Sequence, residues 1–292
     1  MKHILSSAAV LALLLMFPQV TAAQDKVVFP STDGDLKGGT PTTVTGYLYK
    51  PEGAGPFPAL VAMHGCNGIV GEDQKVHALY GTWGEVLSRE GFMVLFPDSF
   101  GSRGHGDLCA VLGEGRVQPN REMPRDAYGA LAYLRTRADV RPNSVAIFGQ
   151  SFGASAMFFT IAEGARPKDV PPDQDFRLAV AFYPGCQRFL TGGSKWVPRL
   201  PLLLLMGEAD DFTPPGPCKE LLSRATASGG PPVENHFYSG AHHAFDHPNS
   251  PVRVLTNVKL PPDGRSPTVG TNPEARADAI LKVKQFLSSK MK

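Results

Sequence analysis

The pentapeptide Gly149-Gln150-Ser151-Phe152-Gly153 constrains the fold of this chain more than any other segment. An apolar, β-branched run at residues 144–148 precedes it and predicts a strand, and the small-residue run at 154–159 predicts a helix directly after it. A strand that turns at once into a helix strains the serine backbone. At the positions two residues before and two residues after the serine, a side chain with a Cβ would collide with the neighbouring strand or helix. The two flanking glycines therefore indicate a sharp turn that lifts the Ser151 hydroxyl clear of a sheet edge.

The rest of the chain predicts the sheet that such a turn needs. Continuous apolar runs, which are typical of strands buried on both faces, lie at residues 58–64, 92–97, 178–183 and 200–206. Two further strands are expected at 42–49 and 233–238, the first of them antiparallel, and helices at 78–89, 126–137, 217–227 and 273–289. Strands separated by helices predict a doubly wound, mainly parallel sheet with helices on both faces. With the turn at Ser151, this pattern is typical of the α/β-hydrolase fold.

Acidic and histidine doublets follow two of the predicted strands. Asp210 and Asp211 come after the strand 200–206, and His242 and His243 come after the strand 233–238. In such sheets the chemistry lies at the carboxyl ends of the strands, and the chain order Ser, Asp, His is that of α/β-hydrolases. A serine hydroxyl needs a histidine to take its proton, and that histidine needs a carboxylate to orient it. The pattern predicts a Ser-His-Asp triad but leaves open which member of each doublet takes part.

The loop that follows the strand 58–64 is the expected site of an oxyanion hole. It reads His64-Gly65-Cys66-Asn67, and its glycine would let the backbone bend close to Ser151. A tetrahedral intermediate needs two donors aimed at its oxygen, and we assign them to the backbone N–H groups of Cys66 and Phe152. The alternative is an ordinary turn from strand to helix. His64 is interpreted as a structural histidine that bonds loop backbone.

These motifs together resemble the dienelactone hydrolase family of α/β-hydrolases, in particular its exported members. The resemblance rests on the pentapeptide at residues 149–153, whose sharp turn is called the nucleophile elbow, and on four further segments, residues 63–68, 97–104, 207–214 and 240–246. It implies that Asp210 orients the base and that His243 is the base. The founding members carry a Cys nucleophile, whereas this chain has Ser151, which favours ordinary ester hydrolysis. The family's acidic substrates also suggest that Arg103 holds a substrate carboxylate, although Arg103 could equally bond loop carbonyls or solvent.

The four cysteines all lie past the carboxyl ends of predicted strands. Pairing by neighbourhood predicts the disulfides Cys66–Cys109 and Cys186–Cys218. A cysteine nucleophile has little support because no cysteine occupies an elbow. No metal site is expected, since the chain has no Cys-x-x-Cys and adjacent histidines point to different sides of the chain.

The first 23 residues predict an export signal. Lys2 and His3 precede an apolar run over residues 4–17, and small residues follow up to Ala23. The run is shorter than the roughly 20 apolar residues that cross a bilayer, and no later segment is long and apolar enough. We therefore expect a secreted or periplasmic protein with one α/β-hydrolase domain at residues 24–292. The segment 185–198 is too short for a large lid.

These features predict an exported serine hydrolase that cleaves small-molecule carboxylic esters or lactones through an acyl-enzyme. The mechanism needs no cofactor, and a net charge of +2 gives no reason to expect nucleic-acid binding. Two alternatives stay open: a peptidase or polyester hydrolase with the same triad, and a catalytically silent binding protein on the same fold. The sequence does not indicate the oligomeric state or the natural substrate.

Overall fold

A computed structural model describes residues 24–111, 113, 115–191, 195–231, 233–260 and 262–291. The predicted signal peptide, residues 1–23, lies outside the described residues. The strands and helices follow in the order β1 (Gln24–Pro30), β2 (Thr43–Tyr49), β3 (Phe57–Met63), α1 (Ala78–Arg89), β4 (Met93–Pro97), α2 (Glu122–Arg135), β5 (Val140–Gln150), α3 (Phe152–Ile161), β6 (Ala179–Phe182), α4 (Gln187–Leu190), β7 (Leu202–Gly207), α5 (Pro215–Ala227), β8 (Val233–Tyr238), β9 (Arg253–Val254), β10 (Thr268–Val269) and α6 (Pro273–Met291).

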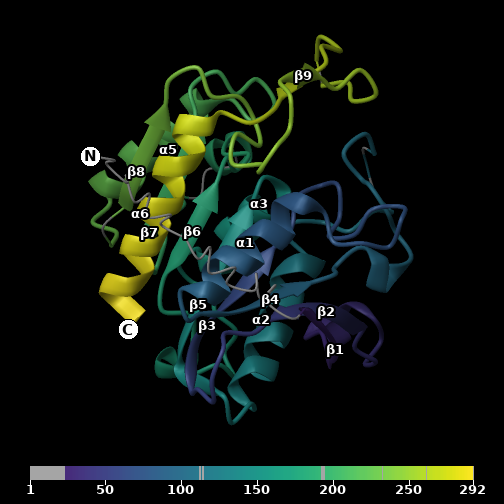
Figure 1. The fold of residues 1–292 in the computed structure, drawn as a ribbon, viewed down its shortest axis with the longest axis vertical. Coiled ribbons are helices and arrows are strands. Elements are labelled where there is room, and N and C mark those ends of the chain that lie inside the picture. The colour runs from purple at the N-terminus through teal and green to yellow at the C-terminus, as the bar shows by residue number, and fades with distance from the viewer. Residues whose placement is uncertain are drawn as a thin grey trace, which may run out of the picture.

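The main sheet has eight strands in the order β1-β2-β4-β3-β5-β6-β7-β8. Strand β2 is antiparallel to both β1 and β4, and every other neighbouring pair is parallel. Helices α1 and α6 cover one face of this sheet, and α2 and α3 cover the other (Figure 1). The predicted fold class, an α/β-hydrolase fold with a doubly wound, mainly parallel sheet, is confirmed.

The burial of the central strands explains why their sequences lack alternation. Strands β4, β6 and β7 are buried at every position, because helices cover both faces of the parallel part of the sheet. Helix α1 has the predicted bounds, and α2 begins four residues before the predicted helix at 126–137. Because β5, β7 and β8 run parallel to one another, their carboxyl ends lie at the same edge of the sheet.

Strand β1, the short helix α4 and the strand pair β9–β10 were not predicted. Strand β1 is largely exposed and pairs along its whole length with β2, and its only apolar run is the short one at residues 27–29. So short a run does not by itself predict a strand. Strands β9 and β10 have two residues each and form a small antiparallel sheet near the carboxyl ends of the main strands (Figure 1). Pairs this short leave too few positions for a periodic pattern.

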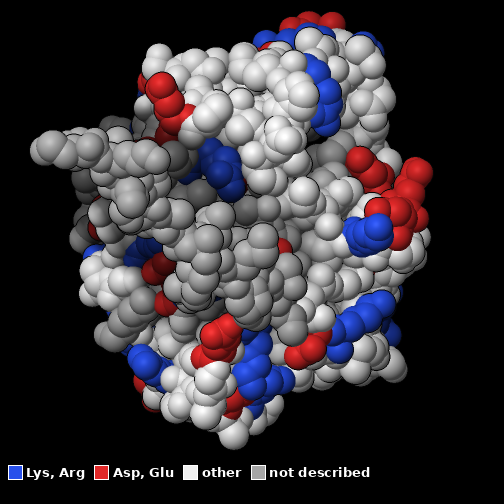
Figure 2. All heavy atoms as spheres, viewed as in Figure 1, with Lys and Arg blue, Asp and Glu red and all other residues white. Residues whose placement is uncertain are grey.

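The surface carries charges of both signs. On the face shown in Figure 2, acidic and basic side chains are interspersed with uncharged ones, and its described residues form no broad area of one sign. Among the described residues, no helix is long and apolar enough to cross a membrane.

Candidate active site

Ser151 lies at the turn between β5 and α3 in the conformation that the pentapeptide predicts. Its φ of 54° and ψ of −117° are strained for a residue with a side chain. A Cβ on Gly149 would lie 2.7 Å from the Cα of Ala154, and one on Gly153 would lie 2.2 Å from the carbonyl oxygen of Met63. Both glycines are therefore required by close backbone packing, and this packing holds the turn in place.

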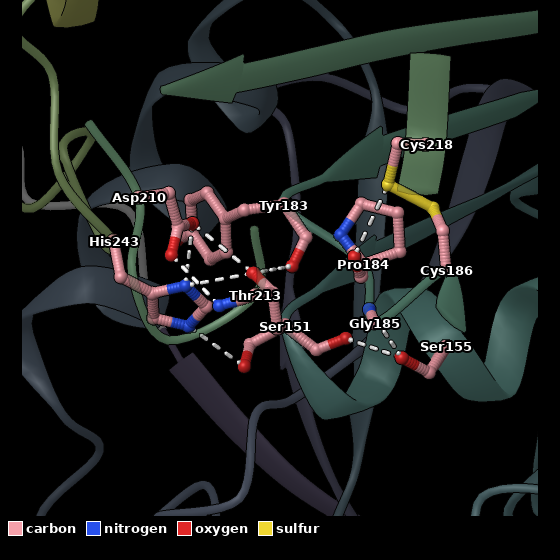
Figure 3. Close-up of a disulfide and its surroundings, with 10 residues drawn as sticks. All are labelled: Ser151, Ser155, Tyr183, Pro184, Gly185, Cys186, Asp210, Thr213, Cys218 and His243. Atoms are coloured by element: carbon pink, nitrogen blue, oxygen red, sulfur yellow. Dashed lines mark hydrogen bonds and ion pairs between the residues drawn. A yellow bond between two sulfur atoms is a disulfide. The ribbon is translucent and has the colours of Figure 1, made fainter. Parts of the chain in front are cut away.

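Three side chains from separate loops meet at this turn (Figure 3). The His243 Nε2 lies 2.9 Å from the Ser151 Oγ, and the His243 Nδ1 lies 2.8 Å from Oδ2 of Asp210. The Asp210 carboxylate also accepts hydrogen bonds from the backbone N–H groups of Phe212 and Thr213. With Nδ1–H donating to the carboxylate, Nε2 is free to accept the serine proton. This is the geometry that activates a serine hydroxyl for attack on a carbonyl.

The other member of each doublet has a different partner. Asp211 accepts hydrogen bonds from the backbone N–H and the hydroxyl of Thr268, and so fixes β10 to the loop after β7. The Nδ1 of His242 lies 2.9 Å from the carbonyl oxygen of Ala209. Neither side chain has a hydrogen bond to Ser151 among the described residues. The structure therefore brings Asp210 and His243 to the serine.

The residues expected to form an oxyanion hole lie beside the serine. A Cβ on Gly65 would be 3.5 Å from that of Ser151, so the loop after β3 approaches the nucleophile closely. Within the described residues, no atom accepts a hydrogen bond from the N–H of Cys66 or Phe152. The Cys66 carbonyl is held by the N–H of Leu108 at 2.7 Å. Both N–H groups thus remain available to an oxygen placed above Ser151.

Two disulfides support the loops around this site. Cys66 is bonded to Cys109, and Cys186 is bonded to Cys218 (Figure 3 shows the second), which are the pairs that the cysteine positions predicted. The first disulfide connects the loop after β3 to the segment after β4. The second connects the loop after β6 to helix α5.

His64 is a buried structural histidine. Its Nε2 accepts a hydrogen bond from the backbone N–H of Ser99, so the protonated Nδ1 donates to the carbonyl oxygen of Gly65 at 2.8 Å. Burial lowers the pKa of His64 and keeps the ring neutral. Both ring nitrogens therefore bond backbone groups, and the ring holds the loop after β3 next to the segment after β4.

The expected role of Arg103 in substrate binding is wrong. Its guanidinium is buried and forms ion pairs with Asp33 and Asp126 at 2.8 Å each, and it also donates to the carbonyl oxygen of Ser99. Burial acts to raise the pKa of Asp33, but hydrogen bonds from Thr42 and Arg103 outweigh it and lower that pKa. Both terminal nitrogens of the guanidinium are held by these partners, and its Nε is buried without a partner among the described residues. Arg103 therefore fixes the segment after β4 and offers no exposed donor to a substrate carboxylate.

Arg103→Met is accordingly expected to lower stability and leave catalysis unchanged. The substitution leaves Asp33 and Asp126 without their cation, and breaking a buried ion pair costs about 3–5 kcal/mol. Arg89→Met is the control, because the Arg89–Glu85 pair is exposed and should contribute less than about 1 kcal/mol. Urea unfolding measures both. An unchanged free energy of unfolding, with a raised KM for anionic esters only, would restore the substrate role.

A cavity of about 320 Å³ opens at Ser151. Arg253 of β9 is the arginine that lines it, and Leu255 and Val258 form part of its apolar wall. Sequence reasoning missed these residues because they follow a turn in a segment with no apolar pattern. It also missed Thr213, whose hydroxyl lies 3.1 Å from both the Asp210 Oδ2 and the His243 Nδ1. A threonine three residues after an aspartate is a recognisable turn signal that could have indicated it.

Comparisons with known proteins agree with this architecture. A model of the dienelactone hydrolase family matches residues 44–291, and no curated protein sequence matches the chain. A dienelactone hydrolase-like promiscuous phosphotriesterase from metagenomic libraries has a TM-score of 0.62 and 17% identity, covering 92% of this chain and 100% of that one. Esterase 2 of Thermogutta terrifontis has a TM-score of 0.60 and 18% identity, over 94% and 97% of the two chains.

An acylaminoacyl peptidase of Pyrococcus horikoshii is also similar, with a TM-score of 0.64 and 14% identity. The match covers 94% of this chain but only 43% of the peptidase. At these identities the three structures share the fold with this chain, and the family match extends over most of its length.

Proposed function

The chain belongs to the dienelactone hydrolase family, and we propose that it is an exported serine hydrolase that cleaves carboxylic esters or lactones through an acyl-enzyme. The observation that carries this proposal is the continuous series of hydrogen bonds from Ser151 through His243 to Asp210. This series has a half-buried serine and a buried histidine and carboxylate, and it lies beside two backbone donors that have no partner among the described residues. These are the requirements of acyl transfer.

In the acylation half-reaction, the Ser151 Oγ attacks the ester carbonyl carbon while the His243 Nε2 takes the serine proton. The carbonyl electron pair moves onto oxygen, and the N–H groups of Cys66 and Phe152 stabilise the resulting anion. Asp210 remains ionised and stabilises the imidazolium. When the intermediate collapses, the bond to the leaving alcohol breaks and His243 returns the proton to that alcohol.

In the deacylation half-reaction, water replaces the serine as the nucleophile. His243 takes a proton from the water as it attacks the acyl-enzyme carbonyl, and the same two backbone donors receive the oxyanion. Collapse releases the carboxylic acid and returns the proton to Ser151. Every proton passes through His243, so this mechanism needs no cofactor.

The size and the lining of the cavity support a small-molecule substrate. Its volume of about 320 Å³ falls within the range of small-ligand sites. Its lining combines apolar side chains with many polar and charged ones, which include Asn67, Asp107 and Arg253. Export is supported by the two disulfides, because disulfides persist in oxidising compartments.

Steady-state hydrolysis of an aryl ester of a short acid, a lactone and a peptide anilide tests the proposal. Turnover of the ester and lactone that Ser151→Ala removes would support it. Cleavage of the anilide in clear preference to both would favour a peptidase with the same triad. Saturable ligand binding without turnover of any of these compounds would indicate a silent binding protein and contradict the proposal.

A further inference from the structure

The Asp246 carboxylate is buried at the base of the active site and is not used by the reaction above. It is 2% exposed, and within the described residues no Lys, Arg or His side chain forms an ion pair with it. Three neutral donors satisfy it instead. The Trp83 Nε1 donates at 2.8 Å, the Gln150 Nε2 at 2.6 Å and the Tyr183 hydroxyl at 2.5 Å. A buried carboxylate without a cation is costly to desolvate, so its retention needs a physical reason.

The position of Asp246 in the chain supplies the first reason. Asp246 lies three residues after His243, and its partner Gln150 lies one residue before Ser151. The Asp246–Gln150 hydrogen bond therefore joins the same two segments as the His243–Ser151 hydrogen bond. Ala244, between His243 and Asp246, has a φ of 56°, which is costly for a residue other than glycine. Strain of this kind persists only where surrounding contacts hold the backbone in place.

Tyr183 connects the same carboxylate to the histidine ring. Its hydroxyl bonds Asp246, and its ring centroid lies 4.5 Å from that of His243. Its carbonyl oxygen accepts a hydrogen bond from the Thr213 hydroxyl, which lies 3.1 Å from the His243 Nδ1 (Figure 3). Tyr183 also has a positive φ, of 39°, so its backbone is held in a strained conformation. One carboxylate thus fixes both the histidine loop and the aromatic ring that the histidine packs against.

We propose that Asp246 is a positioning residue for the serine hydrolase reaction, one that sets the distance and the ring orientation of His243 relative to Ser151. The inference rests on the proposed function. Asp246 does not line the cavity, whereas Gln150 and Tyr183 do. Its loss is therefore expected to disturb the reacting geometry with little effect on substrate binding.

The chemistry of the contacts favours this role. Burial raises the pKa of Asp246, and the hydrogen bonds from Tyr183, Trp83 and Gln150 oppose that rise. Removing the carboxylate leaves three buried donors without an acceptor and frees the loop next to His243. Displacement of a reacting group by about 1 Å can cost about a hundredfold in rate.

Kinetics of Asp246→Ala and Asp246→Asn test the proposal. We expect Asp246→Ala to lower kcat by about ten- to a hundredfold with KM within about twofold. Asp246→Asn should recover most of this loss, because its amide oxygen can accept from Trp83 and Gln150 while its NH₂ group donates to the Tyr183 hydroxyl. Asp175→Asn is the matched control. Asp175 is a similarly buried carboxylate held by Arg199 and Tyr128, and it lies before β6 at the opposite edge of the sheet. The Asp175→Asn variant should have a lower free energy of unfolding and an unchanged kcat.

Tyr183→Phe keeps the test decisive if Asp246→Ala fails to fold. It retains the ring against His243 and removes only the hydroxyl that bonds Asp246, and we expect a fall in kcat of about three- to tenfold. Unchanged kcat in folded Asp246→Ala or in Tyr183→Phe would overturn the proposal, as would an Asp246→Asn variant no more active than Asp246→Ala. Ser151→Ala separates the two hypotheses. If that variant retains wild-type turnover, the proposed function fails; if it is inactive while Asp246→Ala keeps full kcat, only the positioning role fails.

Discussion

Replacing Ser151 by alanine is expected to lower kcat for an aryl ester by about a millionfold. The Ser151 Oγ is the group placed 2.9 Å from His243 Nε2, next to two backbone donors that have no partner in the described part of the chain. Without it no acyl-enzyme can form, and removal of a triad serine elsewhere costs about this much. The residual rate would come from binding and from the backbone donors alone.

Ser155→Ala is the matched control for this substitution. Ser155 lies one helical turn further along α3, and its hydroxyl accepts a hydrogen bond from the backbone N–H of Gly185 (Figure 3). Its loss should lower kcat by less than about tenfold, or about 1.4 kcal/mol of transition-state stabilisation. A Ser151→Ala variant within tenfold of wild type, at equal thermal stability, would refute the assignment of the nucleophile.

The adjacent histidines and carboxylates give the second large expected effect. His243→Ala should lower kcat by about four to six orders of magnitude, and Asp210→Asn by about four, because an asparagine at this position sets the wrong histidine tautomer. His242→Ala and Asp211→Asn should stay within about tenfold, since these side chains bond Ala209 and Thr268 and not the serine.

These four variants must be compared at matched thermal stability, because loss of the fold would imitate loss of the reaction. An inactive His242→Ala beside an active His243→Ala would show that the base is the other histidine. Full activity in all four variants would contradict the triad itself.

The sharp turn at Ser151 could be predicted from the sequence. Gly149 and Gly153 pack against backbone atoms that leave no room for a Cβ. The two glycines of the pentapeptide therefore indicate the tight turn directly. The buried strands were also predictable, because burial on both faces removes alternation from their sequences. The histidine doublet was different: periodicity cannot decide which of two neighbours faces Ser151, and the choice of His243 came from the family resemblance.

Arg103 shows why some side chains could not be assigned. A positive charge in a long loop beside the site could bind a substrate or a buried acid, and the sequence does not reveal that Asp33 and Asp126 converge on it. Those partners lie 70 and 23 residues away in the chain. The same holds for Asp246, whose partners Trp83 and Tyr183 become neighbours only through the order of the strands.

Mass spectrometry of the protein after reaction with an organophosphonate tests the central claim most directly. The reagent reacts with an activated serine and mimics the tetrahedral intermediate at the oxyanion donors. We expect one phosphonyl group per chain, mapped to the peptide that carries Ser151, with complete loss of esterase activity and no labelling of Ser151→Ala. Labelling at Ser99 or Ser155, or esterase activity that persists in fully labelled protein, would contradict it.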